Sequence, residues 1–165
     1  MNSIAALLHE LAAYDLWANT RFVDRLRREP DAVLDAPTPN SFPSLRKTVL
    51  HIRDAENAWM CRLNGEPVPW PADEGHDLDG LLRVSNRLHD LTLSFDDAAM
   101  NGEREYRTLK GDLFKAQVWR MLMHCFNHST QHRGQLITMM RALGLDDIPA
   151  NDLVVFQRTI PVGTT

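Results

Sequence analysis

Prolines and glycines divide this 165-residue sequence into a few long segments, and that division limits what the chain can fold into. Proline cannot continue a helix or a central strand, and glycine commonly ends a helix. The stretches "EPDAVLDAPTPNSFPS" and "GEPVPWPADEGHD" are two such breaks. Between the breaks, apolar residues recur with the 3.6-residue period of an amphipathic helix. The sequence therefore predicts an all-α fold made of long helices.

Four long helices are expected, and the two polar segments between and after them suggest shorter elements. The predicted helices span about residues 3–29, 44–64, 77–100 and 114–143. Ser3 is a suitable N-cap for the first helix, Asp77 or Asp79 for the third, and Gly144 is a suitable C-cap for the fourth. Segment 102–117 alternates weakly and predicts a short hairpin or an extended excursion. These elements favour a four-helix bundle, in which one long crossover is acceptable.

Composition excludes several classes of function. The chain has 18 Lys plus Arg against 22 Asp plus Glu, so it lacks the basic field that nucleic-acid binding needs. No apolar run approaches the ~18 residues of a membrane span. Cys61 and Cys125 have no CxxC spacing, and the N-terminus does not resemble a signal peptide. We expect one domain over residues 1–165, a cytoplasmic location, and no nucleic-acid or membrane partner.

The stretch "HCFNHSTQHRGQ", residues 124–135, carries three histidines at four-residue intervals. Helical phase places His128 and His132 on the apolar stripe of the fourth helix and His124 at its edge. Two imidazoles four residues apart on a helix lie ~5–6 Å apart and can converge on one ion. Burying them unpaired would cost several kcal/mol, and a metal ion would partner both. The alternative interpretation is a polar, hydrogen-bonded helix face.

A metal site needs at least one further ligand, and the second predicted helix offers candidates. His51 lies in "VLHIRDAENAW", close to Asp54 and Glu56. His51 and Glu56 fall on opposite flanks of that helix's apolar stripe, and either flank can face a neighbour in a bundle. Spacing alone leaves the third ligand open.

A family resemblance adds to these observations. The pieces that carry it are "YDLWANTRFVDRL", "SFPSLRKTVLHIRDAENAWMCRLNGE", "PANDLVVF" and, most specifically, NHxxxHRGQ in the last long helix. In these the sequence resembles the DinB/YfiT-like family of small four-helix-bundle metalloproteins, which is distinct from the DNA polymerase called DinB. The resemblance implies a metal held by one histidine of the second helix and two of the fourth, here His51, His128 and His132. It also implies that His124 is not a ligand.

The resemblance also implies a function. Three histidines without a fourth protein ligand leave a position for water or substrate, as in catalytic sites. Characterised relatives imply a metal-dependent thiol S-transferase that joins a low-molecular-weight thiol to a small electrophile in detoxification or the stress response. A metal-assisted hydrolase and a non-catalytic, stress-induced metal-binding dimer are the alternatives. A related group of iron-dependent sulfoxide synthases has HxxxHxE, but Gly134 stands at the Glu position here, which argues against an iron oxygenase.

The expected cofactor is a divalent metal ion, with zinc or nickel ahead of iron or manganese. The expected partners are a small-molecule thiol, an electrophile and a second copy of the chain, because relatives are commonly homodimers. Trp119 and Phe126 lie on a second apolar face of the fourth helix, which another helix or another subunit would cover.

Other residues near the motif have two interpretations each. Glu56 is a candidate general base, although an ion pair with Arg53 or Lys47 explains it equally well. Asn127 is a weak catalytic candidate, and with Gln131 it could instead orient an imidazole or simply be solvated.

Three further residues are expected to be structural. Asp15 falls within an apolar stripe and should bond to a neighbouring helix. Arg133 is expected in a salt bridge or a dimer contact, and Cys125 as an inert core thiol.

Overall fold

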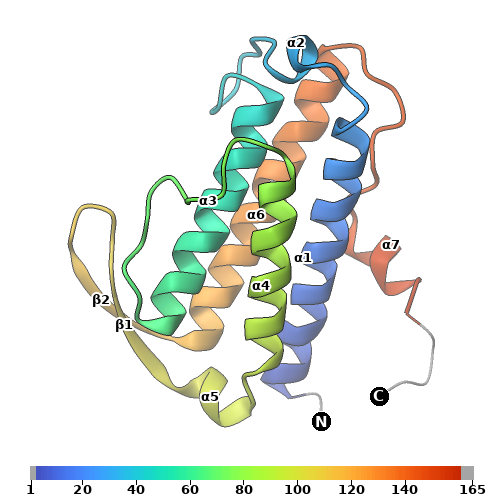
Figure 1. The fold of residues 1–165 in the computed structure, drawn as a ribbon. Helices are drawn as coiled ribbons and strands as arrows, with labels where there is room; N and C mark the ends of the chain where they lie inside the picture. The colour runs from blue at the N-terminus through green and yellow to red at the C-terminus, as the bar shows by residue number, and fades with distance from the viewer. Residues whose placement is uncertain (1–2, 161–165) are drawn as a thin grey trace.

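Four long helices pack side by side in the computed structural model, which describes residues 3–160 (Figure 1). They are α1 (Ile4–Leu26), α3 (Leu45–Asn64), α4 (Asp79–Leu93) and α6 (Val118–Ala142). α1 and α3 each contact both α4 and α6, so every long helix has two neighbours. α1 and α6 run in one direction and α3 and α4 in the other (Figure 1). The predicted all-α four-helix bundle is confirmed.

Capping side chains and left-handed glycines set several helix ends. The hydroxyl of Ser3 accepts a hydrogen bond from the backbone N–H of Ala6 at the start of α1. Ser44 caps α3 in the same way. Gly65 follows α3 with a φ of +71°, and Gly144 lies just after α6 with a φ of +72°. Both are positive φ values that glycine adopts without a steric penalty.

The third predicted helix is shorter than expected, because a second helix begins before Met100. α4 ends at Leu93, and α5 (Asp97–Asn101) follows after a break. The Asp96 side chain accepts from the backbone N–H of Ala99 and so caps the new helix. Short helices also occupy two loop regions, α2 (Asp31–Leu34) and α7 (Leu153–Gln157).

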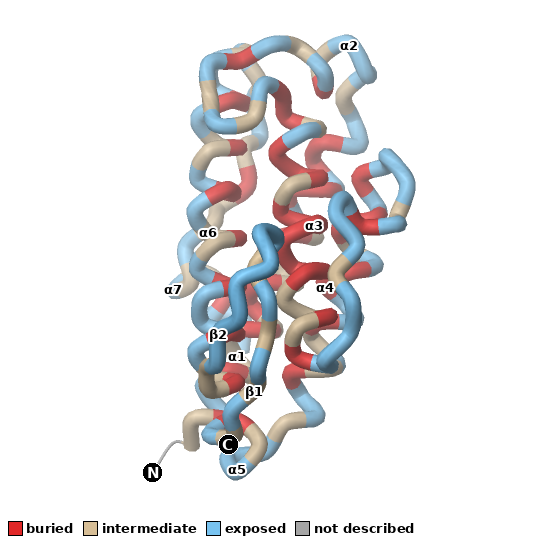
Figure 2. The backbone as a smooth tube through the Cα atoms, turned by 90° about the vertical axis from the view of Figure 1, so that its left-hand side faces the viewer, coloured by how far each residue is buried: buried red, intermediate tan, exposed pale blue. Residues whose placement is uncertain are grey.

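A two-stranded antiparallel hairpin precedes α6, as segment 102–117 predicted. Its strands are β1 (Glu103–Arg107) and β2 (Leu113–Gln117), with Tyr106 opposite Phe114. α6 begins at Val118 rather than near Phe114, because Phe114 belongs to β2. The hairpin lies along α3 and α6 near the end of the bundle where α6 begins (Figures 1 and 2).

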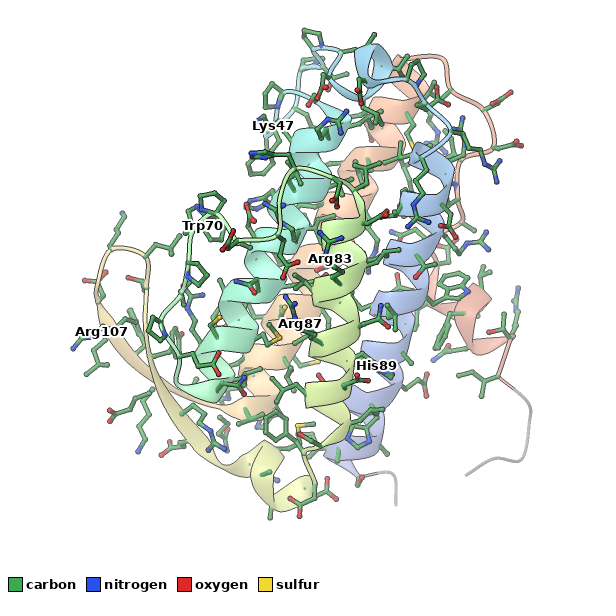
Figure 3. The ribbon with its side chains drawn as sticks, in the orientation of Figure 1. Lys47, Trp70, Arg83, Arg87, His89 and Arg107 are labelled. Atoms are coloured by element: carbon green, nitrogen blue, oxygen red, sulfur yellow. The ribbon has the colours of Figure 1, made fainter. Side chains whose placement is uncertain are left out.

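The connection from α3 to α4 runs back along the bundle, since these two neighbours are parallel (Figure 1). It is the long crossover that the bundle topology allowed. Trp70 in this connection is 44% exposed and lies beside α3 (Figure 3).

The core of the described residues has two large apolar clusters and a small one of Tyr14, Ala18 and Phe156, with a buried polar layer between the helices. One large cluster centres on Phe22, Ile52 and Leu136, and the other on Leu8 and Leu122. The buried polar residues that join α1, α3, α4 and α6 are Asp15, Asn19, Glu56, Ser85, Ser129 and Arg133. Among residues 3–160, no helix combines the length and the apolar character needed to cross a membrane.

Candidate metal centre

Three histidines from two helices meet on one side of the bundle. His51 comes from α3, and His128 and His132 come from successive turns of α6. The Nε2 atom of His128 lies 3.1 Å from the Nε2 atom of His51 and 3.1 Å from that of His132. One ligand atom from each residue lies within 4.8 Å of the others, a spacing that could hold a metal ion. The structure thus brings together the three residues that the family resemblance implied.

The three facing Nε2 atoms cannot all be satisfied by hydrogen bonds to one another, whereas one bound cation can satisfy all three. His132 Nδ1 lies 2.7 Å from the amide oxygen of Gln135, which can only accept, so Nδ1 carries the hydrogen. A neutral His132 therefore directs the lone pair of Nε2 toward His128. The Nε2 of His128 has either one hydrogen or one lone pair, yet it faces two imidazole nitrogens. One cation satisfies all three, and nitrogens bound tetrahedrally at ~2.05 Å would lie about 3.3 Å apart.

The protonation of the histidines also favours metal binding. Burial and, to a smaller extent, the neighbouring His132 lower the pKa of His51 to about 4. Burial also lowers the pKa of His128 to about 3, with added repulsion from His132 and His51. Both imidazoles are therefore neutral at pH 7, which is the form that binds a metal ion.

Two loops border the three histidines. The Phe42 ring, in the segment before α3, stacks on His51 with centroids 4.0 Å apart and meets the His132 ring edge-on at 5.6 Å. Trp70 of the crossover loop lies edge-on to His51 at 6.0 Å. His132 is buried, whereas His51 and His128 are half-buried, so a small molecule can reach the group.

The two carboxylates that competed with His51 as a third ligand make other contacts. Asp54 pairs with Arg53 and accepts a hydrogen bond from the backbone N–H of Ala72 in the crossover loop. Glu56 is fully buried in the polar layer. Its carboxylate is hydrogen-bonded to Asn19, Ser85 and Ser129, so the suggested ion pair with Arg53 or Lys47 does not form.

Glu56 is also an unusual acid. Burial raises its pKa well above the ordinary value, and the nearby Asp15 carboxylate raises it further. In the described part of the chain, none of its hydrogen bonds goes to one of the three histidines.

The weak catalytic candidate Asn127 is not brought to the histidines. It is exposed and lines a hollow with Leu11 and Tyr14 on the α1 side of α6. The contact that orients an imidazole comes from Gln135, whose amide nitrogen also donates to the Ser41 hydroxyl. This role of Gln135 was not predicted from the sequence. The signal was its position three residues after His132, on the same helix face.

His124 lies outside the three-histidine group, as the family resemblance implied. It is exposed, and its ring packs 4.9 Å from Trp59 and 6.2 Å from His128. Among residues 3–160 its ring makes no hydrogen bond within the protein and instead packs on the aromatic ring of Trp59.

The residues expected to be structural are buried within the chain. Arg133 donates to Asp15 across the α1–α6 interface at 2.5 Å, so the predicted salt bridge is present. Burial raises the pKa of the Cys125 thiol well above its ordinary value, which fits an inert thiol. Phe126 is buried and Trp119 packs against the same cluster. Phe126 is thus covered within the chain, whereas Trp119 is half-buried.

Sequence comparisons agree with this architecture. The model of the DinB family matches residues 1–159 of the chain. Protein DinB of Bacillus subtilis (strain 168) is 24% identical over 164 residues, and the alignment covers 92% of each chain. The match thus includes all the long helices and the three histidines.

Proposed function

The chain belongs to the DinB family, and from that premise we propose that it binds a divalent metal ion through His51, His128 and His132 and transfers a low-molecular-weight thiol to a small electrophile. The observation that carries the proposal is the convergence of three imidazoles without a fourth protein ligand. Among the described residues, no Cys, Asp, Glu or further His joins this group. A structural zinc site would normally be closed by four protein ligands.

A divalent ion held there would lower the pKa of a thiol or a water molecule beside it. The chain's own residues supply the remaining conditions. Gln135 holds His132 in one tautomer and orientation. Phe42 and Trp70 flank His51 with apolar surface that limits water at the site.

The transfer itself is a balanced substitution or addition. The thiol loses its proton to solvent, and its sulfur forms a bond to the electrophilic carbon. A leaving group then departs with the electron pair, or a conjugated double bond accepts the sulfur and takes up a proton at its other end. No oxidant or reductant is required.

Metal content and cobalt spectroscopy test the proposal. We expect untagged protein to bind one equivalent of metal, zinc or nickel before iron or manganese, and His51→Ala to lose it. His124→Ala, which removes the neighbouring exposed histidine of the motif, should retain the metal. Addition of a cellular low-molecular-weight thiol should shift the visible spectrum of the cobalt-substituted protein. Absence of any shift across a panel of such thiols would contradict thiol transfer.

Turnover separates the alternatives. Hydrolysis would proceed without a thiol, whereas the proposed transfer depends on one. A purely structural metal would leave metal-loaded protein inactive toward every thiol and electrophile pair while His51→Ala lowered its thermal stability. The homodimer expected from relatives predicts twice the 18.8 kDa chain mass in light scattering.

A further inference from the structure

A hollow lies between the hairpin, the end of α3 and the start of α6. Its lining includes His124, whose ring lies 6.2 Å from that of His128. The volume of the hollow is about 420 Å³. The side chains that matter for its chemistry are Trp59, Arg62, Tyr106, Phe114, Arg120 and His124. Figure 2 shows the hairpin crossing in front of the helices in this part of the molecule.

The walls of the hollow are flat and aromatic. The Trp59 ring packs 5.3 Å from Tyr106 and 4.9 Å from His124. Tyr106 in turn stacks with Phe114, its partner across the hairpin, at 6.0 Å. Phe114 is nevertheless 51% exposed, because its outer edge borders the hollow. Such a surface suits a planar apolar group.

The charge in the hollow is positive and lacks a counter-ion. The Arg62 guanidinium lies 4.6 Å from the centre of the Trp59 ring and 5.7 Å from that of Tyr106. Its Nε donates to the backbone oxygen of Arg107 at 3.1 Å. Within residues 3–160, its two terminal nitrogens have no acceptor, and no carboxylate pairs with Arg62 or with Arg120.

In this respect Arg62 differs from the three buried arginines among the described residues. The buried Arg25, Arg53 and Arg133 each pair with a carboxylate. Burial lowers the pKa of the half-buried Arg62 below its ordinary value, yet a guanidinium stays charged at neutral pH. Guanidinium groups bind carboxylates through two parallel hydrogen bonds, and Arg62 has its two terminal nitrogens free for them.

We propose that this hollow binds an elongated, planar organic carboxylate, with its acid group at Arg62 and Arg120 and its apolar body along Trp59 and His124. His124 is one helical turn from His128, so the far end of such a molecule points toward the three histidines. Arg62 follows His51 by eleven residues, about 16 Å along the helix axis. That the bound acid is the electrophile of thiol transfer rests on the proposed function, whereas its binding does not.

A matched pair of probes tests binding in the metal-free protein, where a carboxylate cannot coordinate an ion. The probes are trans-cinnamate and trans-cinnamamide, which differ in charge but hardly in shape. We expect cinnamate to bind at least tenfold more tightly in NMR titrations. It should also shift the indole N–H signal of Trp59, identified by its absence in Trp59→Phe.

Variants then test whether Arg62 supplies the positive charge that binds the acid group. Arg62→Gln should weaken cinnamate at least tenfold and leave cinnamamide unchanged, while Arg62→Lys should retain part of the preference. Arg141→Gln removes an exposed arginine near the other end of α6 and should have no effect. Melting curves verify that each variant is folded. Equal binding of the two probes, or an unchanged affinity in folded Arg62→Gln, would overturn the proposal.

A failure of binding in the hollow can be distinguished from a failure of thiol transfer. Cinnamate that binds only the metal-loaded protein, and not His51→Ala, would place the acid at the ion and overturn the assignment to the hollow. Cinnamate binding that depends on Arg62 supports the hollow, even if no thiol is ever transferred.

Discussion

Two aspartates of α1, Asp15 and Asp24, form ion pairs of the same length that differ in burial. Asp15 and Arg133 meet at 2.5 Å with side-chain exposures of 2% and 0%, whereas Asp24 and Arg27 meet at 2.5 Å with exposures of 52% and 44%. Removing one partner of a buried pair costs about 3–5 kcal/mol, because the other charge stays buried without compensation. An exposed pair contributes about 0–1 kcal/mol. We therefore expect Asp15→Asn to destabilise the fold far more than Asp24→Asn.

Thermal and urea unfolding, both followed by far-UV circular dichroism, measure Tm and the denaturant slope of the two variants on the metal-free protein at pH 7. At roughly 2–4 °C per kcal/mol for a chain of this size, Asp15→Asn should lower Tm by about 6–20 °C and Asp24→Asn by at most about 4 °C. The denaturant slope should be unchanged in both, since neither substitution alters the surface exposed on unfolding. Equal losses for the two variants, or a loss below about 1 kcal/mol for Asp15→Asn, would refute the reasoning from burial.

Three further predictions concern the histidines and the polar layer. Gln135→Ala should weaken metal binding by about 10–100-fold in chelator competition, whereas the exposed Gln131→Ala should not. The free energy of unfolding of Glu56→Gln, measured in urea at pH 7, should lie within about 1 kcal/mol of the wild-type value. The reason is that a raised pKa favours the protonated acid, which glutamine resembles. A loss above about 3 kcal/mol would show that Glu56 is ionised. Metal-free protein should lose stability as the pH falls from about 6.5 toward 4, since the lowered pKa values of His51 and His128 mean that the unfolded chain binds more protons. His128→Asn should reduce the pH dependence of the unfolding free energy. An unchanged pH dependence in this variant would contradict the prediction.

The sequence predicted most of the fold because local signals and packing agree there. Ser3 and Ser44 are N-caps and Gly65 a left-handed C-cap in the structure, as their residue types suggested. The errors arose where two local signals compete. Asp96 caps a new helix inside a segment whose apolar period continues. Phe114 fits a strand and a helix equally well, and pairing with Tyr106 places it in the hairpin.

The candidate site was predictable only in part, for a physical reason. His128 and His132 share a helix, so their relative placement follows from helical geometry alone. Whether His51 or Glu56 faces them depends on the rotation of α3 about its own axis, which its packing against α4 and α6 sets. The family resemblance supplied that information. Gln135 was within reach of the same intrahelical reasoning as the histidine pair.

The buried Asp15–Arg133 ion pair links the stability of the fold to the metal site, because Arg133 directly follows His132 in α6. His132 and Arg133 are about 100° apart around the helix, so fixing Arg133 against Asp15 on α1 also fixes the direction in which His132 points toward α3. A buried pair can thus set helix rotation as well as contribute energy. We therefore expect folded Asp15→Asn to bind metal more weakly than Asp24→Asn in chelator competition at low temperature, although neither residue touches a histidine of the site. Equal affinities in the two variants would show that the ion pair stabilises the bundle without orienting α6.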